Sequence, residues 1–583
     1  MGWGERLQNM YQYIFFAVVL FSLSGCVFYS TEQASPSTPT PTLLPALARL
    51  IQVRDDAIIV PLPQSPPTFN AYLNDTGYEE LVGELVFGAL VEIGPNGQYY
   101  PELAIEVPTL ENGGLSFDGL QVTWKLRPNV LWSDGTLFTS KDVYFTWNAL
   151  RQSGIFASGF DLITDIDMPD KLTAVVHYSR FYPNYRLQFG GEGTGIFPAH
   201  YCGDVANMLR WECNSKPIST GPFILAEQEN EQLIFTPNPY YWKPNRPLAQ
   251  QLIFIVNNNA EYRVGMLKRE TGYLDLWTQA DELDIAQDIE NITMFATNPP
   301  RFMLRLVPNL SAFGTADSSQ PHHIFTDVDV RRAVRHAINV PQIIDTVFDN
   351  RAVIADTELD RHRCEVSRYN YNPAVANALL SQVGWFDEDG DGIRECHGCQ
   401  FAVEGTPLTF ESYYYEEFGN PLAQVHYQIV DMLAEVGIEM IPKKIEGINL
   451  WDTWMEDGIE MRGNFSMNLW DDGYYGIDPT DYLFDMYDPR AIPTENDPLA
   501  GFNVMRYRNL SLIAIFDELY MPIPDTRRQQ RICQLATILY RDLPVIPLLA
   551  FPDIYLINTR LQGVYPHIYD TVTWNAEDWY LEE

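Results

Sequence analysis

The sequence predicts an α/β protein, because amphipathic helices are followed, after a short break, by apolar strand-like runs. Over 422–436, apolar residues recur with helical spacing; the pattern ends at Gly437 and continues as the strand-like run 438–441. A second helical pattern over 532–539 precedes the apolar run 545–550. This order of elements favours domains with mostly parallel sheets.

Further elements follow the same alternation along the chain. Residues 122–126 alternate as a strand, and Ser140 is a candidate N-cap for the helix that follows. Apolar residues within 330–338 have the spacing of a helix that packs on one side. Asn372 and Pro373 form a cap and first turn for another helix.

The N-terminus indicates a lipoprotein signal. An apolar run too short to span a bilayer leads into Leu-Ser-Gly-Cys, which ends at Cys26. We expect residues 1–25 to be a signal peptide, and Cys26 to carry lipid on the extracytoplasmic face of the cell membrane. An ordinary signal peptide with a stray cysteine is the alternative. Residues 26–49 are a tether rich in Pro, Ser and Thr, which favours extended chain.

Composition narrows the class of protein. A hydrophobic content of 46% and an aromatic content of 13% indicate a well-filled globular core. The net charge of −39 argues against a nucleic-acid partner, because a phosphate backbone requires Lys and Arg to neutralise it. The length beyond the tether is enough for about three domains.

The seven cysteines indicate an oxidising compartment. With Cys26 set aside, six remain, an even number. The short separation of Cys202 and Cys213 predicts a disulfide between them. Pairing among the other four stays open: Cys364, Cys396, Cys399 and Cys533.

Four blocks of sequence occur in a characteristic order. They are W-K-L-R-P-N-V with W-S-D-G and K-D-V (124–143), T-G-P-F with P-N-P-Y-Y-W (220–242), D-V-R-R-A with A-I-N (329–339), and D-P-T-D-Y-L (478–483). Together they resemble the family 5 extracellular solute-binding proteins of ABC importers, in the peptide-binding group. The resemblance covers nearly all of the chain beyond the tether.

That resemblance implies a class II periplasmic-binding fold, with two lobes joined by a hinge and an additional small domain. Lobe I would comprise residues 50–98, 216–310 and 549–583, the small domain 99–215, and lobe II 311–548. A monomer without a cofactor would capture a peptide-like ligand between the lobes and deliver it to an ABC permease and its ATPase. The alternatives are an oligosaccharide-binding member and, in a different class, a lipid-anchored hydrolase. No HExxH, GxSxG or P-loop motif supports an enzyme.

The best binding candidates follow a half-buried strand at 465–470. Trp470, Asp471, Asp472 and Tyr474 lie where this strand enters a loop, which is where open α/β domains bind ligands. In the peptide-binding members, an Asp shortly after a Trp holds the α-ammonium of the ligand. We therefore expect Asp472, with Asp471 as second choice, to pair with that ammonium.

One acidic loop resembles the start of a calcium site. Asp387, Asp389 and Asp391 precede Gly392 with EF-hand spacing, but Gly398 stands where the bidentate Glu belongs. The sequence therefore favours a solvated turn over a calcium site.

Overall fold

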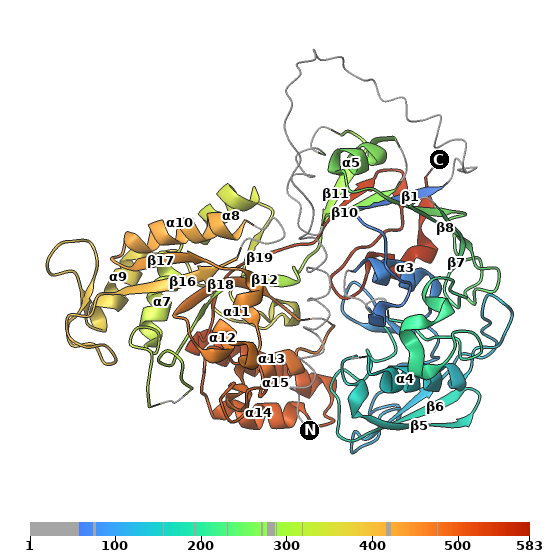
Figure 1. The fold of residues 1–583 in the computed structure, drawn as a ribbon, viewed down its shortest axis with the longest axis horizontal. Helices are drawn as coiled ribbons and strands as arrows, with labels where there is room; N and C mark the ends of the chain where they lie inside the picture. The colour runs from blue at the N-terminus through green and yellow to red at the C-terminus, as the bar shows by residue number, and fades with distance from the viewer. Residues whose placement is uncertain are drawn as a thin grey trace, which may run out of the picture.

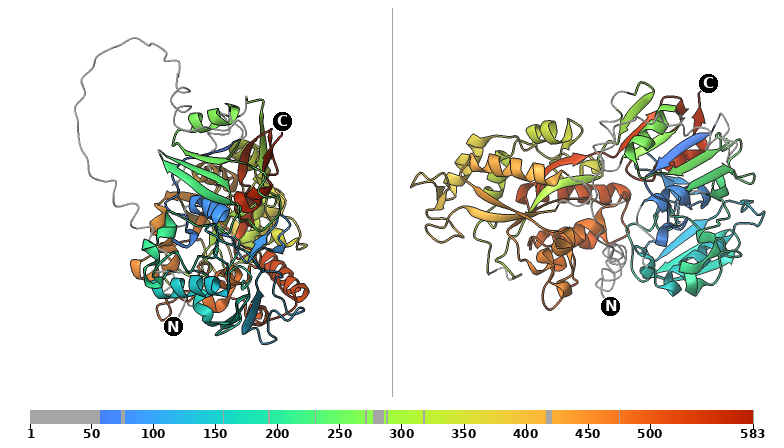
Figure 2. Two further views of the ribbon diagram at one scale, coloured as in Figure 1. Left: turned by 90° about the vertical axis from the view of Figure 1, so that its right-hand side faces the viewer. Right: turned by 45° about the horizontal axis from the view of Figure 1, so that its top comes forward.

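The structure is a computed structural model that describes residues 57–582, apart from 74–76, 156, 192–193, 230, 270–271, 277–285, 287–288, 317–318, 416–420 and 475. The described chain forms two halves that lie side by side (Figures 1 and 2). We call residues 57–296 with 554–582 the first half, and residues 302–551 the second half. Cys26 lies outside the described residues, and so do the predicted signal peptide and tether.

Outside the predicted small domain, the first half contains two small sheets and their helices. The four-stranded sheet has the order β1 (Ile58–Leu62), β9 (Leu252–Val256), β8 (Gln232–Pro237) and β7 (Phe223–Glu229). The three-stranded sheet places β20 (Ile554–Asn558) between β10 (Tyr273–Leu276) and β11 (Ile292–Ala296). The helices are α3 (Tyr78–Val86) and α5 (Ala260–Arg269). Short strand pairs are β2 (Val91–Ile93) with β3 (Tyr99–Pro101), and β21 (Leu561–Gln562) with β22 (Tyr580–Leu581).

A third sheet lies within the predicted small domain. It is antiparallel, in the order β4 (Gln121–Lys125), β6 (Thr173–Tyr178), β5 (Ile163–Asp170), next to α4 (Ser140–Ser153). Trp124 of this sheet and Trp147 of α4 are buried in the same apolar core as the four-stranded sheet. The cap of α4 is Thr139 and not Ser140, because Thr139 and Asp142 form a reciprocal capping box.

The second half is built on a six-stranded sheet. Its order is β13 (Val353–Ile354), β19 (Ile546–Phe551), β12 (Phe302–Pro308), β18 (Met467–Asp472), β16 (Thr409–Tyr414) and β17 (Glu439–Lys444). The first helices along the chain are α7 (Val328–Ala337), α8 (Val340–Phe348), α9 (Pro373–Gln382) and α10 (Leu422–Ala434). Later helices are α11 (Gly447–Trp451), α12 (Ile459–Arg462), α13 (Thr480–Tyr487), α14 (Ser511–Leu519) and α15 (Asp525–Asp542). A hairpin pairs β14 (Trp385–Phe386) with β15 (Glu395–Cys396).

The α/β class is confirmed, but the prediction of mostly parallel sheets is wrong. In the six-stranded sheet β18, β16 and β17 run parallel to one another, whereas β12 pairs antiparallel to both β18 and β19 and β13 pairs antiparallel to β19. The reason is the path of the chain: β12 leads away from the first half and β19 leads back to it, so the two run in opposite directions. The predicted boundaries at 311 and 548 fall just after β12 and within β19; the division into lobes and a small domain stays a prediction.

Two short segments, 297–301 and 552–553, connect the halves. They are hydrogen-bonded to each other, because Thr297 N–H donates to the carbonyl of Asp553 and Asp553 N–H donates to Oγ1 of Thr297, each at 2.9 Å. Arg301 Nε lies 3.9 Å from a carboxylate oxygen of Asp553. The two connecting segments therefore lie against each other, which is the geometry of a hinge.

Three disulfides join the six cysteines of the described chain. Cys202 pairs with Cys213, as the sequence predicts. Cys364 pairs with Cys533, and Cys396 with Cys399, which settles the pairing that the sequence left open.

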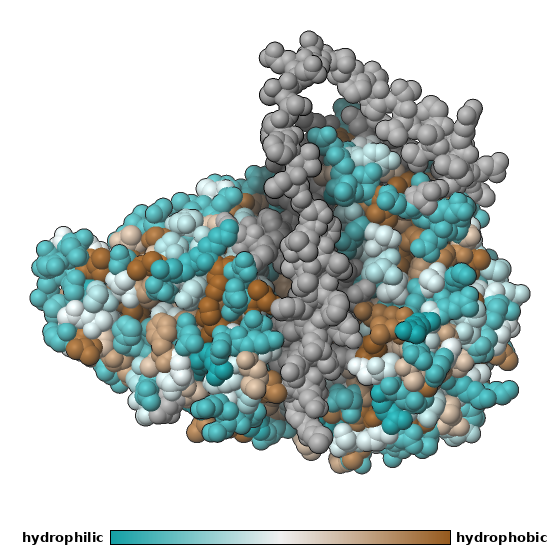
Figure 3. Space-filling view, viewed as in Figure 1, coloured by the Kyte–Doolittle hydropathy of each residue, from teal (hydrophilic) through white to brown (hydrophobic). Residues whose placement is uncertain are grey.

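The described residues include no helix that is both long and apolar enough to cross a membrane. The face shown in Figure 3 is mostly hydrophilic, with hydrophobic residues scattered over both halves.

Candidate ligand-binding cleft

A pocket of about 430 Å³ lies between the two halves. The first half contributes residues near Tyr99 and the segment that includes Phe181, Tyr185 and Arg186. The second half contributes His362, the loop at 477–478 and the start of α15. A ligand in this pocket would touch both halves at once, so its binding would depend on their relative position.

The pocket carries both signs of charge. Arg186 Nη1 lies 3.3 Å from Oδ2 of Asp525, an ion pair that joins the two halves. Arg528 Nη1 lies 3.1 Å from Oδ2 of Asp478, within the second half. Asn184 of the first half donates to the backbone carbonyl of Asp478 at 3.1 Å. Cationic and anionic groups of one ligand could both find partners here.

The four predicted site residues are not among those that line this pocket, although the ring of Tyr474 stacks on that of His362, which does line it. Trp470, near the end of β18, is half-buried; its ring packs against Trp451, with centroids 6.1 Å apart, and beneath the guanidinium of Arg305. Tyr474 is only 4% exposed, and its ring contacts Tyr482. In this conformation both aromatic rings are packing residues.

Asp472 belongs to a buried ionic network centred on Arg305, which is fully buried. Arg305 forms ion pairs with Asp472 and Glu358. Tyr482 donates to Asp472 at 3.1 Å, and Tyr487 donates to Glu358 at 2.6 Å. Burial raises the pKa of Glu358. Asp472 is thus already paired with a cation of the chain.

Two more carboxyls lie near this network. Asp471 accepts a hydrogen bond from the hydroxyl of Tyr415 at 2.8 Å, and burial raises the pKa of Asp471. Glu460 accepts from Nδ2 of Asn468 at 2.7 Å, and burial raises the pKa of Glu460 to about 7. Arg305 is therefore surrounded by more carboxyl groups than it can neutralise, which is an environment that favours a further cation.

Two groups of carboxylates within the described chain have the spacing to share a metal ion. One is Glu84, Glu92 and Asp570, all buried, and the other is Asp387, Asp389 and Glu395 in the exposed β14–β15 loop. In the second group Glu395 takes the place predicted for Asp391, whose carboxylate instead accepts from the N–H of Ile393 at 2.8 Å. Hydrogen bonds within the loop account for its shape, in keeping with a turn.

Sequence reasoning did not single out the residues that line the pocket. Asp478 was part of a recognised block but was not assigned a role. Arg186, Asp525 and Arg528 come from segments without a motif, and they meet only because the halves fold against each other.

Two α/β halves joined at a hinge, with a pocket between them, are typical of solute-binding proteins. The sequence model of the bacterial extracellular solute-binding proteins, family 5, matches residues 98–493. The chain therefore belongs to this family, whose members are binding proteins.

Individual relatives are distant. A putative ABC transporter peptide-binding protein of Brucella ovis is 27% identical over 369 residues, which cover 60% of this chain and 63% of that protein. The alignment thus spans less than two thirds of this relative's length.

Solved structures show the same fold. The oligopeptide-binding protein AppA from Bacillus subtilis, in complex with a nonapeptide, gives a TM-score of 0.60 at 18% identity, covering 90% of this chain and 99% of that one. NikA from Brucella suis, in complex with Fe(III)-EDTA, gives a TM-score of 0.70 at 18% identity. The match covers 90% of this chain and 100% of NikA.

Proposed function

We propose that this protein is a lipid-anchored, extracytoplasmic binding protein that captures a peptide-like ligand between its halves and delivers it to an ABC transporter permease. The observation that carries the proposal is the mixed-charge pocket between two hinged halves, in a chain of the family 5 solute-binding proteins. The relative from Brucella ovis is named as a peptide-binding protein, and AppA holds a nonapeptide.

A peptide suits the charges of the pocket. A free peptide carries an ammonium and a carboxylate; Arg528 and Asp478 present both signs of charge inside the pocket, and the Arg186–Asp525 pair joins the halves beside them. A charge that is buried without a partner costs several kcal/mol, so a closed pocket of this composition favours a ligand with both charges.

We further propose that the ligand ammonium binds at Asp472, with Asp471 as second choice. Arg305 forms ion pairs with both Asp472 and Glu358, so that one cation serves two carboxylates. Asp471 adds a third carboxyl group nearby. A bound ammonium would relieve the repulsion among these groups. It would form a charge-assisted hydrogen bond that contributes about 1.5–3 kcal/mol.

The test begins with mass spectrometry of any ligand that co-purifies, followed by calorimetry with that peptide. Asp472→Asn is expected to weaken binding by about tenfold or more, since about 1.4 kcal/mol corresponds to a factor of ten. The N-acetylated peptide should bind poorly to the wild type. Asp389→Asn, in the exposed β14–β15 loop, is the matched control and should leave the affinity unchanged.

Two outcomes would contradict these proposals. Equal affinity for the free and the acetylated peptide would refute the proposed pairing of the ligand ammonium with Asp472 or Asp471. Failure of every peptide, together with binding of an oligosaccharide, would replace the peptide assignment with the sugar-binding alternative, and ligand turnover would favour the hydrolase class.

The lipid anchor has its own test. Mass spectrometry of the mature protein should find a lipidated Cys26 at its N-terminus, and Cys26→Ser should abolish the modification. An unmodified Cys26 in the mature wild type would refute the anchor and leave the ligand proposal intact.

A further inference from the structure

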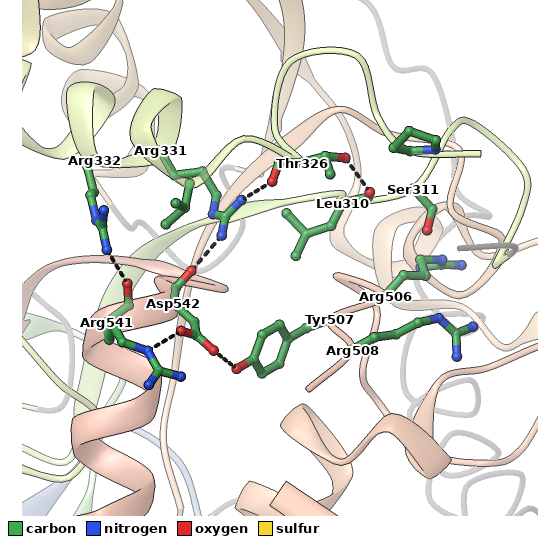
Figure 4. Close-up of a pocket in the computed structure, with 12 residues that line it drawn as sticks. Leu310, Ser311, Thr326, Arg331, Arg332, Arg506, Tyr507, Arg508, Arg541 and Asp542 are labelled. Carbon is green, nitrogen blue, oxygen red and sulfur yellow. Dashed lines mark hydrogen bonds and ion pairs between the residues drawn. The ribbon is translucent and has the colours of Figure 1, made fainter. Parts of the chain in front are cut away.

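A second pocket, of about 460 Å³, lies entirely within the second half. Five arginines line it, and we call it the arginine pocket: Arg331, Arg332, Arg506, Arg508 and Arg541. Arg332 and Arg541 lie on one side, and Arg506 and Arg508 lie on the other (Figure 4). It shares no lining residue with the pocket between the halves.

Three of the five guanidiniums form no ion pair with a carboxylate within the described chain. Arg331 donates to the backbone carbonyls of residues 325, 326, 542 and 543. Arg506 donates to the carbonyls of residues 460, 461 and 504, and Arg508 to that of Ala316. Carbonyls satisfy the N–H groups but leave the positive charge in place.

One buried donor at the pocket remains unused. Arg506 is 3% exposed, and its Nε has no hydrogen-bond partner in the described structure. Buried donors normally have partners, so an acceptor group that reaches this atom would be stabilised. Burial lowers the pKa of Arg331 and of Arg506 to about 10, which leaves both charged at neutral pH.

The carboxylates near the pocket do not cancel this charge. Asp542 pairs with Arg541 at 2.7 Å and also accepts from Tyr507 and Asn509. Asp329 pairs with Arg332 at 2.8 Å. Asp327 caps α7 by accepting from the N–H of Asp329, and Glu460 lies behind Arg506, with its carboxyl bound to Asn468. The cluster is locally cationic within a chain of net charge −39.

We propose that the arginine pocket binds a phosphate group, as inorganic phosphate or a soluble phosphomonoester. Guanidinium groups match the geometry of phosphate oxygens and bind them through paired hydrogen bonds. The volume accommodates a small organic phosphate. The overall negative charge disfavours docking on an anionic membrane, so a soluble anion is the assigned source.

The experiment is calorimetric titration of the full protein with inorganic phosphate and with glycerol phosphate. The test variant is Arg508→Gln combined with Arg541→Gln, because both side chains are exposed. The control is Arg527→Gln, another exposed arginine on α15, which pairs with Glu518 outside the pocket. Thermal unfolding verifies that all variants are folded.

We expect wild type and control to bind phosphate equally, and the double variant to bind at least about tenfold more weakly. Raising the salt concentration should weaken binding in parallel. Absence of phosphate binding at 10 mM, or binding that the double variant leaves unchanged, would overturn the proposal. Binding to phosphatidylglycerol vesicles without binding of free phosphate would overturn the assignment to a soluble anion. None of these outcomes depends on the peptide proposal.

Discussion

Two buried arginines of the second half, Arg305 and Arg506, are stabilised in different ways. Arg305 lies between the carboxylates of Glu358 and Asp472, and nearby acidic and phenolic groups raise its pKa against the effect of burial. Arg506 lies among backbone carbonyls, and burial lowers its pKa to about 10. Both have hydrogen-bond acceptors, but of the two only Arg305 forms ion pairs with carboxylates in the described structure.

The difference separates two requirements of a buried cation. Hydrogen bonding satisfies the N–H groups, whereas only an opposite charge removes the electrostatic cost. The two sites therefore favour ligands of opposite charge. The excess of carboxyl groups around Arg305 favours a cation, and the arginines around Arg506 that lack carboxylate partners favour an anion.

The largest expected effect comes from removing each arginine in turn. Arg305→Met would leave Glu358 and Asp472 buried without a cation, and should lower the free energy of unfolding by about 3–5 kcal/mol. Arg506→Met would leave carbonyls unpaired but would break no ion pair, and should cost about 1–3 kcal/mol. Urea denaturation of both variants at pH 7 measures the contrast. If Arg506→Met lowers the free energy of unfolding as much as Arg305→Met or more, the proposed difference between the two arginines is wrong.

Glu460 connects the two arginines, and its ionisation gives the next effect. Its carboxyl is near Arg305, and its backbone carbonyl accepts from Arg506 at 2.8 Å. Burial raises the pKa of Glu460 from 4.5 to about 7, so the folded state retains a proton that the unfolded state releases in this range. Its contribution to stability is complete below pH 4.5 and is lost as the pH rises through about 7.

The Glu460→Gln variant has no carboxyl group to ionise at this position. Its free energy of unfolding should therefore rise relative to that of the wild type as the pH rises from 4.5 to 8. The gain in unfolding free energy is about 3 kcal/mol, since one pKa unit corresponds to about 1.4 kcal/mol. Denaturation curves of both proteins at pH 5 and pH 8 measure it. Parallel pH profiles would show that Glu460 does not titrate there.

The smallest effect concerns the ion pair that joins the halves. Arg186→Gln removes its pair with Asp525, whose side chain is 70% exposed. Exposed pairs contribute at most about 1 kcal/mol, so peptide affinity should fall by no more than about fivefold. Calorimetry with the co-purified peptide, beside Arg527→Gln, measures the change. A loss of a hundredfold would mean that Arg186 binds the ligand directly.

The sequence predicted the helices of the second half well. The apolar spacing and the Asn372 cap identified α9, and the run ending at Gly437 identified α10 and β17, because local propensity and core burial agree there. Strand direction was not predictable, because it depends on where the chain crosses between halves.

The candidate site was less predictable than the fold. The segment after β18 was found, yet Asp472 lies beside Arg305, which is far away in sequence and carries no motif. The arginine pocket was also missed, since its five arginines come from three separate segments. Charge compensation is a property of the folded chain, and spacing along the sequence does not reveal it.

The position of β20 constrains the order of folding. This strand is the centre of the three-stranded sheet in the first half, between β10 and β11, yet it follows the entire second half in sequence. A chain that emerges from its N-terminus can complete the second half, which is one continuous segment, before β20 exists. The three-stranded sheet of the first half cannot form until β20 has been made. The edges of β10 and β11 that pair with β20 therefore need protection during synthesis and export.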